Sequence, residues 1–191
     1  MQRLRNTFLG VLLATASALG SALELGDTLP PVKIPTKGEL ILQNDSIHYT
    51  PWSSEQIHAG TPALVFHLAA RLSSESIIDP LRTRLKEVDY PEGSFQSVSV
   101  INLGDAMWGA AGLAASAMSK NKKETPSATL VADDDNRALA AWGLQSKTVA
   151  VILLNAEGRI VYFHEGSLSE ADIETIITML NAEITKANAA A

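Results

Sequence analysis

The sequence predicts an α/β protein built on a mixed β-sheet, with helices on both faces of the sheet. Two continuous apolar runs, Ala63–Leu68 and Val149–Leu154, have the composition of strands that are buried on both faces. Between them, amphipathic or Ala-rich segments alternate with short strand patterns, which is the order of β-α-β units. A turn and a further strand follow the second run directly, so we expect an antiparallel pair to close the sheet.

A β-hairpin is expected ahead of this alternating part, as an N-terminal extension of the sheet. The segments Glu39–Gln43 and Ser46–Thr50 flank Asn44-Asp45, a pair of residues that favours a tight turn. The segment before the hairpin, residues 23–37, is rich in proline and is expected to be an extended lead-in.

The first long helix is expected from about Ser74 to Val88, because its apolar residues fall on one face. Pro80 lies inside this segment and should kink the helix. The alternating strand Phe95–Ile101 follows. A second, Ala-rich helix is expected over Met107–Ser119, and the lysine-rich run that follows it should be a solvated helix end.

The remaining elements are short strands, a short helix and a closing helix. The shorter ones are expected at Ala128–Ala132 (strand), Asn136–Trp142 (helix), Val149–Leu154 (strand) and Arg159–His164 (strand). Ser169 is followed three residues later by Asp172, which is a capping-box pattern. The last helix should therefore begin at Ser169.

The first residues, 1–22, have the pattern of an export signal. Arg3 and Arg5 give a positive start, and a mostly apolar stretch follows. Ala22 completes a small-x-Ala cleavage pattern, with cleavage after Ala18 or Gly20 as alternatives. The apolar stretch is shorter than the roughly 20 residues that span a bilayer, so we expect a soluble, exported protein and no membrane insertion.

Composition limits the functions open to the remaining domain, residues 23–191. The chain has 15 basic and 21 acidic residues, and without the two arginines of the signal the net charge is −8. Such a charge argues against a nucleic-acid surface. The chain has no cysteine, which excludes cysteine-dependent zinc, haem and iron–sulfur sites. We expect no metal and no cofactor, and we expect an acid of Asp133-Asp134-Asp135 to cap the next helix.

The second half of the chain resembles exported thioredoxin-like and peroxiredoxin-like proteins. The motifs that carry this resemblance are Asp133, Ala141-Trp142-Gly143-Leu144, Val149–Leu154, the turn Asn155-Ala156-Glu157-Gly158-Arg159-Ile160, and Gly166. The whole chain after the signal resembles the YtfJ family of periplasmic proteins, whose function is unassigned. Its motifs here are Leu29-Pro30-Pro31, Gly38-Glu39-Leu40, Arg71-x-Ser73, Asn121-Lys122-Lys123 and Ala141-Trp142. The resemblance implies a thioredoxin-like fold and a periplasmic location.

Both redox chemistries of that fold are excluded. In redox thioredoxins a proline follows the second active-site cysteine by five residues, so Pro80 assigns the two cysteine positions to Leu72 and Glu75. In the peroxiredoxin register, Ser76 stands at the position of the peroxidatic cysteine. Thiol exchange and peroxide reduction both require a thiolate, which a serine hydroxyl cannot replace. The cis-proline that should precede Val149–Leu154 is also missing.

The segment Arg71-Leu72-Ser73-Ser74-Glu75 is the candidate binding site. It follows the carboxyl end of a buried strand, where open α/β sheets bind ligands, and it opens a helix whose N-terminus favours an anion. Arg71 would clamp a carboxylate or phosphate. In the alternative interpretation, Ser73 or Ser74 caps the helix and Glu75 complements its dipole.

Two functional classes follow from these residues. We favour a binding or adaptor module whose partner, a periplasmic protein or a small anionic ligand, docks around Arg71 and the loop near Lys147. The alternative is a cysteine-independent hydrolase or transferase that uses Ser73 or Ser74 with His67. His67 is more simply a core histidine, and the chain lacks a Gly-x-Ser-x-Gly elbow, so the binding module is preferred.

Overall fold

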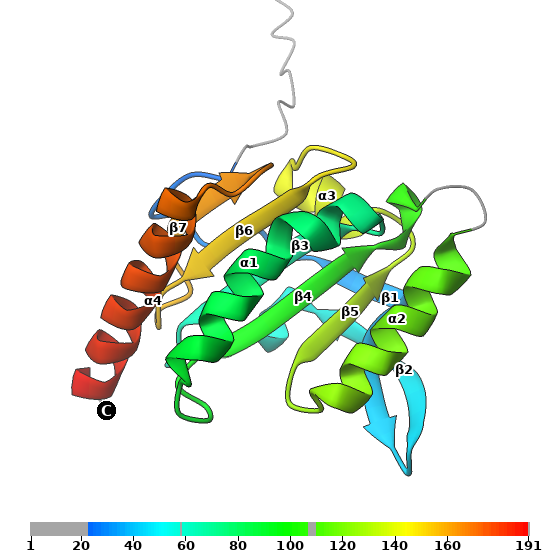
Figure 1. Cartoon of the computed structure of the whole chain (residues 1–191), viewed down its shortest axis with the longest axis horizontal. Helices are drawn as coiled ribbons and strands as arrows, with labels where there is room; N and C mark the ends of the chain where they lie inside the picture. Colours follow the sequence, from blue (N-terminus) through cyan, green and yellow to red (C-terminus); the bar gives the residue numbers. More distant parts are fainter. Residues whose placement is uncertain (1–22, 58, 107–109, 191) are drawn as a thin grey trace, which may run out of the picture.

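The computed structural model describes residues 23–57, 59–106 and 110–190. The signal peptide expected over residues 1–22 lies outside the described residues. Within the described part, seven strands form one sheet in the order β2-β1-β5-β4-β3-β6-β7 (Figure 1).

The strands are β1 (Lys33–Gln43), β2 (Ser46–Ser53), β3 (Ala63–Ala69), β4 (Gln96–Asn102), β5 (Thr129–Asp133), β6 (Val149–Leu154) and β7 (Ile160–Glu165). The helices are α1 (Leu72–Val88), α2 (Ala111–Glu124), α3 (Arg137–Trp142) and α4 (Glu170–Ala190), with short 3₁₀ turns η1 (Ser54–Gln56) and η2 (Leu103–Asp105).

The sheet is mixed, as the order of elements predicts. Strands β3, β4 and β5 are parallel neighbours, whereas β6 pairs antiparallel with β3 and β7 antiparallel with β6. The hairpin of β1 and β2 joins the sheet beside β5, also antiparallel. The parallel pairs bring the carboxyl ends of β3, β4 and β5 to the same edge, and that edge carries the candidate site.

Helices cover both faces of the sheet, which confirms the predicted architecture (Figure 1). On one face, α1 and α4 pack on Leu64, Phe66 and Leu68 of β3 and on β6. The cluster under α2, formed by residues of β1 and β5, lies on the same face. On the opposite face, α3 contributes the fully buried Trp142, whose indole N–H donates to the carbonyl of Pro30 at 2.9 Å.

The N-terminal hairpin starts earlier than the sequence suggests, because the end of the lead-in already belongs to β1. Asn44 and Asp45 both have positive φ, at 49° and 60°, and form the expected two-residue turn. The register shifts between Ile34 and Glu39. Gly38 lies in this irregularity with φ at 74°, and a Cβ there would lie 2.1 Å from the Thr50 carbonyl oxygen. Only glycine fits this position.

The end of α2 was predicted wrongly, because the helix continues past Ser119 to Glu124. Its predicted start at Met107 lies outside the described residues. The lysine run is part of the helix, and Lys122 is buried, with 5% of its surface exposed. Its ammonium donates to the carbonyls of Pro126 at 2.8 Å and Ala128 at 2.7 Å. These hydrogen bonds compensate the Lys122 ammonium for the water that it loses on burial. They also stabilise the turn between α2 and β5.

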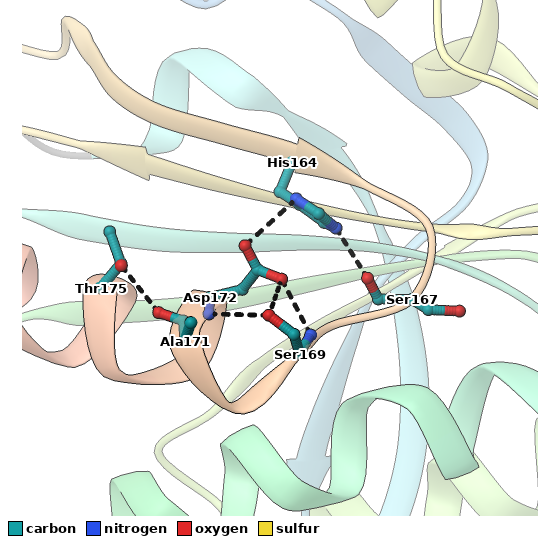
Figure 2. A network of polar contacts seen from close by, with 6 residues as sticks. All are labelled: His164, Ser167, Ser169, Ala171, Asp172 and Thr175. Carbon is teal, nitrogen blue, oxygen red and sulfur yellow. Dashed lines mark hydrogen bonds and ion pairs between the residues drawn. The ribbon is translucent and has the colours of Figure 1, made fainter.

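The predicted capping box is confirmed at the start of α4 (Figure 2). The backbone N–H of Asp172 donates to the Ser169 hydroxyl at 3.2 Å, and the N–H of Ser169 donates to the Asp172 carboxylate at 2.8 Å. The ring of His164, at the end of β7, contacts this cap through Nδ1, which lies 3.9 Å from the Asp172 carboxylate, while its Nε2 lies 2.8 Å from the Ser167 carbonyl. The acid expected to cap α3 is Asp133, whose carboxylate accepts from the N–H of Ala138 at 2.8 Å.

Candidate functional site

Three segments meet at the edge of the sheet where β3 and β4 end and β6 begins. They are the start of α1, the η2 turn after β4 and the loop before β6. Backbone hydrogen bonds hold them together: the N–H of Ala69 donates to the Thr148 carbonyl at 3.1 Å, and the N–H of Ala70 donates to the Asn102 carbonyl at 3.0 Å. The structure therefore brings together the two predicted parts of the site, Arg71 and the Lys147 loop.

Asp105 is the residue that links these segments. Its carboxylate accepts the backbone N–H of Lys147 at 2.7 Å and the side-chain amide of Asn102 at 3.2 Å. Its backbone carbonyl accepts Nε of Arg71 at 3.0 Å. Asp105 is 9% exposed, so these bonds are largely shielded from water. A single residue thus holds the backbone of Lys147 and the side chain of Arg71.

The turn that carries Asp105 is itself fixed by close contacts. The Asn102 side chain accepts the N–H of Gly104 at 3.0 Å, which caps the η2 turn. A Cβ on Gly104 would lie 2.3 Å from the Asn136 side-chain oxygen, so a larger residue here would displace the amide of Asn136 at the start of α3.

Both predicted cations at this edge lack an ion-pair partner among the described residues. Arg71 is partly buried, and Lys147 is exposed with a positive φ of 64°. Neither side chain forms an ion pair with any residue that the structure describes. Beyond the Nε bond to Asp105, the guanidinium of Arg71 keeps its terminal N–H groups free within the described ranges. The α1 N-terminus beside them adds partial positive charge, so the edge is suited to an anion.

The expectation that a serine caps α1 is wrong. The helix begins at Leu72, earlier than expected, so the N-cap is Arg71 and no side chain caps this end. Ser73 and Ser74 lie inside the first turn instead. Ser73 is exposed, whereas Ser74 is 2% exposed and its hydroxyl has no hydrogen-bond partner among the residues that the structure describes. Glu75 lies in the first turn as expected but pairs with Arg82 at 2.8 Å.

His67 lies in the core of β3 and is 1% exposed. It packs edge-on against Trp142, with ring centroids 6.3 Å apart. Burial lowers the pKa of His67 to about 4, against an opposing effect from the charge of Asp105. The ring is therefore neutral at neutral pH, and within residues 23–57, 59–106 and 110–190 its Nε2 has no hydrogen-bond partner.

The serine–histidine alternative lacks the contact that it requires. Within the described part of the chain, neither Ser73 nor Ser74 forms a hydrogen bond to His67. His67 alternates along β3 with Leu68 and so faces the α3 side of the sheet, away from the face that α1 covers. A general base must lie within hydrogen-bond reach of the nucleophile. This geometry does not favour a hydrolase.

Sequence reasoning missed Asp105 and Asn102. Both follow the expected strand Phe95–Ile101, and the parallel order of β3 and β4 puts them beside Arg71. A search for polar residues after each apolar strand would have found them. Among the described residues, no three His, Asp or Glu side chains come together as a metal site needs.

Comparison with known proteins decides the family. The model of a family described as "Bacterial protein of unknown function" (YtfJ_HI0045) matches residues 23–183. The chain belongs to this family. An uncharacterised protein of Haemophilus influenzae is 32% identical over 167 residues, which cover 87% of this chain and 90% of the relative. The uncharacterised protein YtfJ of Escherichia coli is 29% identical over 169 residues, with 88% and 91% covered. The resemblance inferred from the motifs is confirmed.

Comparison of solved structures identifies the fold as thioredoxin-like. The thioredoxin domain of a thiol-disulfide oxidoreductase from Bacteroides vulgatus superposes with a TM-score of 0.53 at 17% identity, covering 83% of this chain and 99% of that domain. At this identity the similarity concerns the fold alone. The YtfJ-family chain has no cysteine, so its scaffold is not equipped for thiol chemistry. Leu72, which the sequence analysis places at the expected position of the first redox cysteine, is 90% exposed. In the described ranges, no helix combines the length and apolar character needed to cross a bilayer.

Proposed function

We propose that this protein is an exported, periplasmic binding or adaptor module that uses a non-redox thioredoxin-like scaffold to hold an anionic group of a partner protein. The observation that carries the proposal is a pair of hydrogen bonds to Asp105. Its backbone carbonyl accepts Nε of Arg71, and its carboxylate accepts the backbone N–H of Lys147. The guanidinium of Arg71 and the backbone that carries Lys147 are thereby kept at one edge of a protein whose overall charge is negative, and neither cation has an ion-pair partner in the described part of the chain.

The anion that this edge suits is a carboxylate. Only Nε of Arg71 donates a hydrogen bond to a described residue, the Asp105 carbonyl. The terminal N–H groups of the guanidinium remain as two parallel donors, which match the two oxygens of a carboxylate. Lys147 adds a point charge on a flexible stem, and the α1 N-terminus adds backbone partial charge. The C-terminus of a partner chain or an acidic side chain supplies such a group.

Two further features support the proposal. Residues 1–22 have the charge and apolar pattern of a cleaved export signal. The two positions that carry cysteines in redox relatives are held by Leu72 and Glu75, so the edge is free of thiol chemistry and available for recognition.

An NMR titration tests the anion site. We expect acetyl-trialanine with a free C-terminal carboxylate to shift the amide signals of residues 71–76 and 147, and its C-terminal amide to shift none of them. Arg71→Ala should abolish the shifts, because it removes the fork. Arg84→Ala is the matched control, since it removes an equal charge from an exposed position paired with Glu174. Equal shifts by the carboxylate and the amide would contradict the proposal.

Export and adaptor function need a second experiment. N-terminal sequencing of protein from the periplasmic fraction should find a chain that begins after Ala22, or after Ala18 or Gly20. The same fraction, passed over immobilised wild type and Arg71→Ala, should leave a partner on the wild type only. Protein that keeps residue 1 and stays in the cytoplasm would refute export.

A further inference from the structure

Helices α1 and α2 lie on the same face of the sheet (Figure 1). Residues of both helices and of β4 line a groove of about 680 Å³. Helix α1 packs over β3 and β6, whereas α2 packs over β1 and β5. Strand β4 runs between these two packed clusters and forms the floor. The groove is open along one side, and its volume lies within the range of ligand sites in proteins.

The floor of the groove is polar, which is unusual for a central strand. Ser97 and Ser99 of β4 line the groove, while Val98 and Val100 between and after them are buried on the opposite face. Ser99 is only 6% exposed. Neither serine hydroxyl has a hydrogen-bond partner in the part of the chain that the structure describes. Both hydroxyls therefore open onto the groove and can donate to, or accept from, a molecule bound there.

The walls of the groove carry more acidic than basic groups. The acidic lining residues are Glu75, Asp79, Asp89 and Glu124, and the basic ones are Arg82 and Lys86. Ion pairs offset part of this charge: the Arg82 guanidinium lies 2.8 Å from Glu75 and 4.0 Å from Asp79, and the ammonium of Lys120 lies 3.7 Å from Glu124. Four acids against two bases still leave the lining with a net negative charge, which favours a cationic ligand over phosphate or carboxylate.

The lining of the groove combines an aromatic pair with hydrogen-bonding side chains. Toward the end of α1 it is lined by the edge-to-face pair Tyr90 and Phe95, whose ring centroids lie 5.2 Å apart. Along its length, hydrogen-bonding side chains come from both walls, namely Thr83 on α1 and Asn121 and Thr125 beside α2. A ligand that fits needs hydrogen-bonding groups along its length, an apolar part and a positive charge.

We propose that this groove binds an extended peptide segment that carries basic side chains and one apolar side chain. A peptide backbone offers donors and acceptors at regular intervals, which the hydroxyls of Ser97 and Ser99 satisfy. Its basic side chains lie near Asp89 and Glu124, and its apolar side chain lies against Tyr90 and Phe95. The charge excludes nucleic acid, and the open shape with hydrogen-bonding groups on floor and walls suits a chain better than a compact small molecule. The site is distinct from the Arg71–Lys147 edge and does not depend on the proposed function.

An NMR titration with the blocked peptide acetyl-Lys-Ala-Phe-Lys-amide tests the proposal. We expect millimolar peptide to shift the amides of Ser97, Ser99 and Thr125, and the charge-reversed acetyl-Glu-Ala-Phe-Glu-amide to leave them unchanged. The affinity should fall as salt is raised. Shifts of equal size with both peptides, no shifts with either, or shifts confined to residues 71–75 would overturn the proposal.

Two sets of variants locate the interaction. The double variant Ser97→Val, Ser99→Val removes the floor hydroxyls with residues that favour strands, and it should weaken binding about tenfold. The double variant Asp89→Asn, Glu124→Gln should weaken it to a similar extent and reduce the salt dependence; asparagine tolerates the positive φ of Asp89. The control Ser46→Val, on the exposed edge strand β2, should bind as wild type does.

Thermal unfolding of each variant checks that the fold is intact. If the serine variant does not fold, the charge variant decides the question by itself, because its substitutions lie at exposed positions. Unchanged affinity in the charge variant would refute the basic peptide. None of these substitutions touches Arg71 or Lys147, so failure here leaves the outcome of the carboxylate titration unaffected.

Discussion

The carboxylate of Asp105 accepts a hydrogen bond from the backbone N–H of Lys147 at 2.7 Å, across 42 residues of sequence. The bond joins the end of β4 to the loop before β6, two segments that do not neighbour each other in the sheet. Because Lys147 has a positive φ, its loop needs a tertiary contact to stay in this conformation. Asp105 supplies that contact, and four predictions follow from this and related contacts.

Asp105→Ala should lower the free energy of unfolding by about 2 to 3 kcal/mol, because the N–H of Lys147 and the amide of Asn102 lose a charged acceptor. Urea unfolding measures the change. The matched control is Asp135→Ala, which removes an acid with an exposed ion pair to Arg137 and should change the free energy by less than about 0.5 kcal/mol. Equal effects would show that Asp105 does not organise the edge.

The histidine in the core should make the protein sensitive to acid. Since the folded-state pKa of His67 is about 4 and its usual value is 6.5, the folded protein favours the neutral ring. The contribution of His67 to stability is fully present above pH 6.5 and is lost as the pH falls from 6.5 towards about 4. The loss should be roughly 3 kcal/mol over this interval.

Urea unfolding over the same pH interval, with wild type and His67→Phe, measures that loss. Phenylalanine keeps an aromatic ring against Trp142 but cannot be protonated, so its stability should depend less on pH. The exposed His48 provides the control: His48→Gln should follow the wild-type curve. A His67→Phe curve parallel to wild type would contradict the prediction.

Lys122→Met should destabilise the protein by about 2 kcal/mol, because the carbonyls of Pro126 and Ala128 lose their charged donor while the apolar stem is retained. Lys123→Met, at the next residue, removes a more exposed charge paired with Asp45 at 3.0 Å and should have an effect below about 0.5 kcal/mol. Thermal unfolding of the two variants provides the comparison. A larger effect at Lys123 would be inconsistent with a role of Lys122 in holding the turn between α2 and β5.

Ser169→Ala should lower the melting temperature by a few degrees and increase hydrogen exchange in the first turn of α4. Hydrogen bonds from Ser169 lower the pKa of Asp172 below its usual value of 3.8. This stabilisation is present above pH 3.8 and disappears at lower pH, so variant and wild type should converge in strong acid. A difference that persists there would assign the effect to helix propensity alone.

The sequence by itself determined the elements whose signal is local. Examples are the apolar runs of β3 and β6, the capping box at Ser169 and the turn at Asn44-Asp45. In each of them the residues that carry the signal lie within a few positions of one another, so a short window of sequence contains it. The absence of cysteine likewise excludes thiol chemistry without any structure.

Only the tertiary structure decided which polar residues act together. Asp105 contacts Lys147 because of the order of the strands in the sheet. Ser99 lines the groove because α1 and α2 leave β4 uncovered between them. No local sequence pattern encodes either arrangement. The sequence predicts a solvated Lys122 because the residue lies in a lysine-rich run. The two carbonyls that bind its ammonium belong to the turn after α2, and tertiary packing sets the position of that turn. The prediction that Ser73 or Ser74 caps α1 was wrong for a related reason. The end of β3 sets where the helix begins, and α1 starts at Leu72, before both serines.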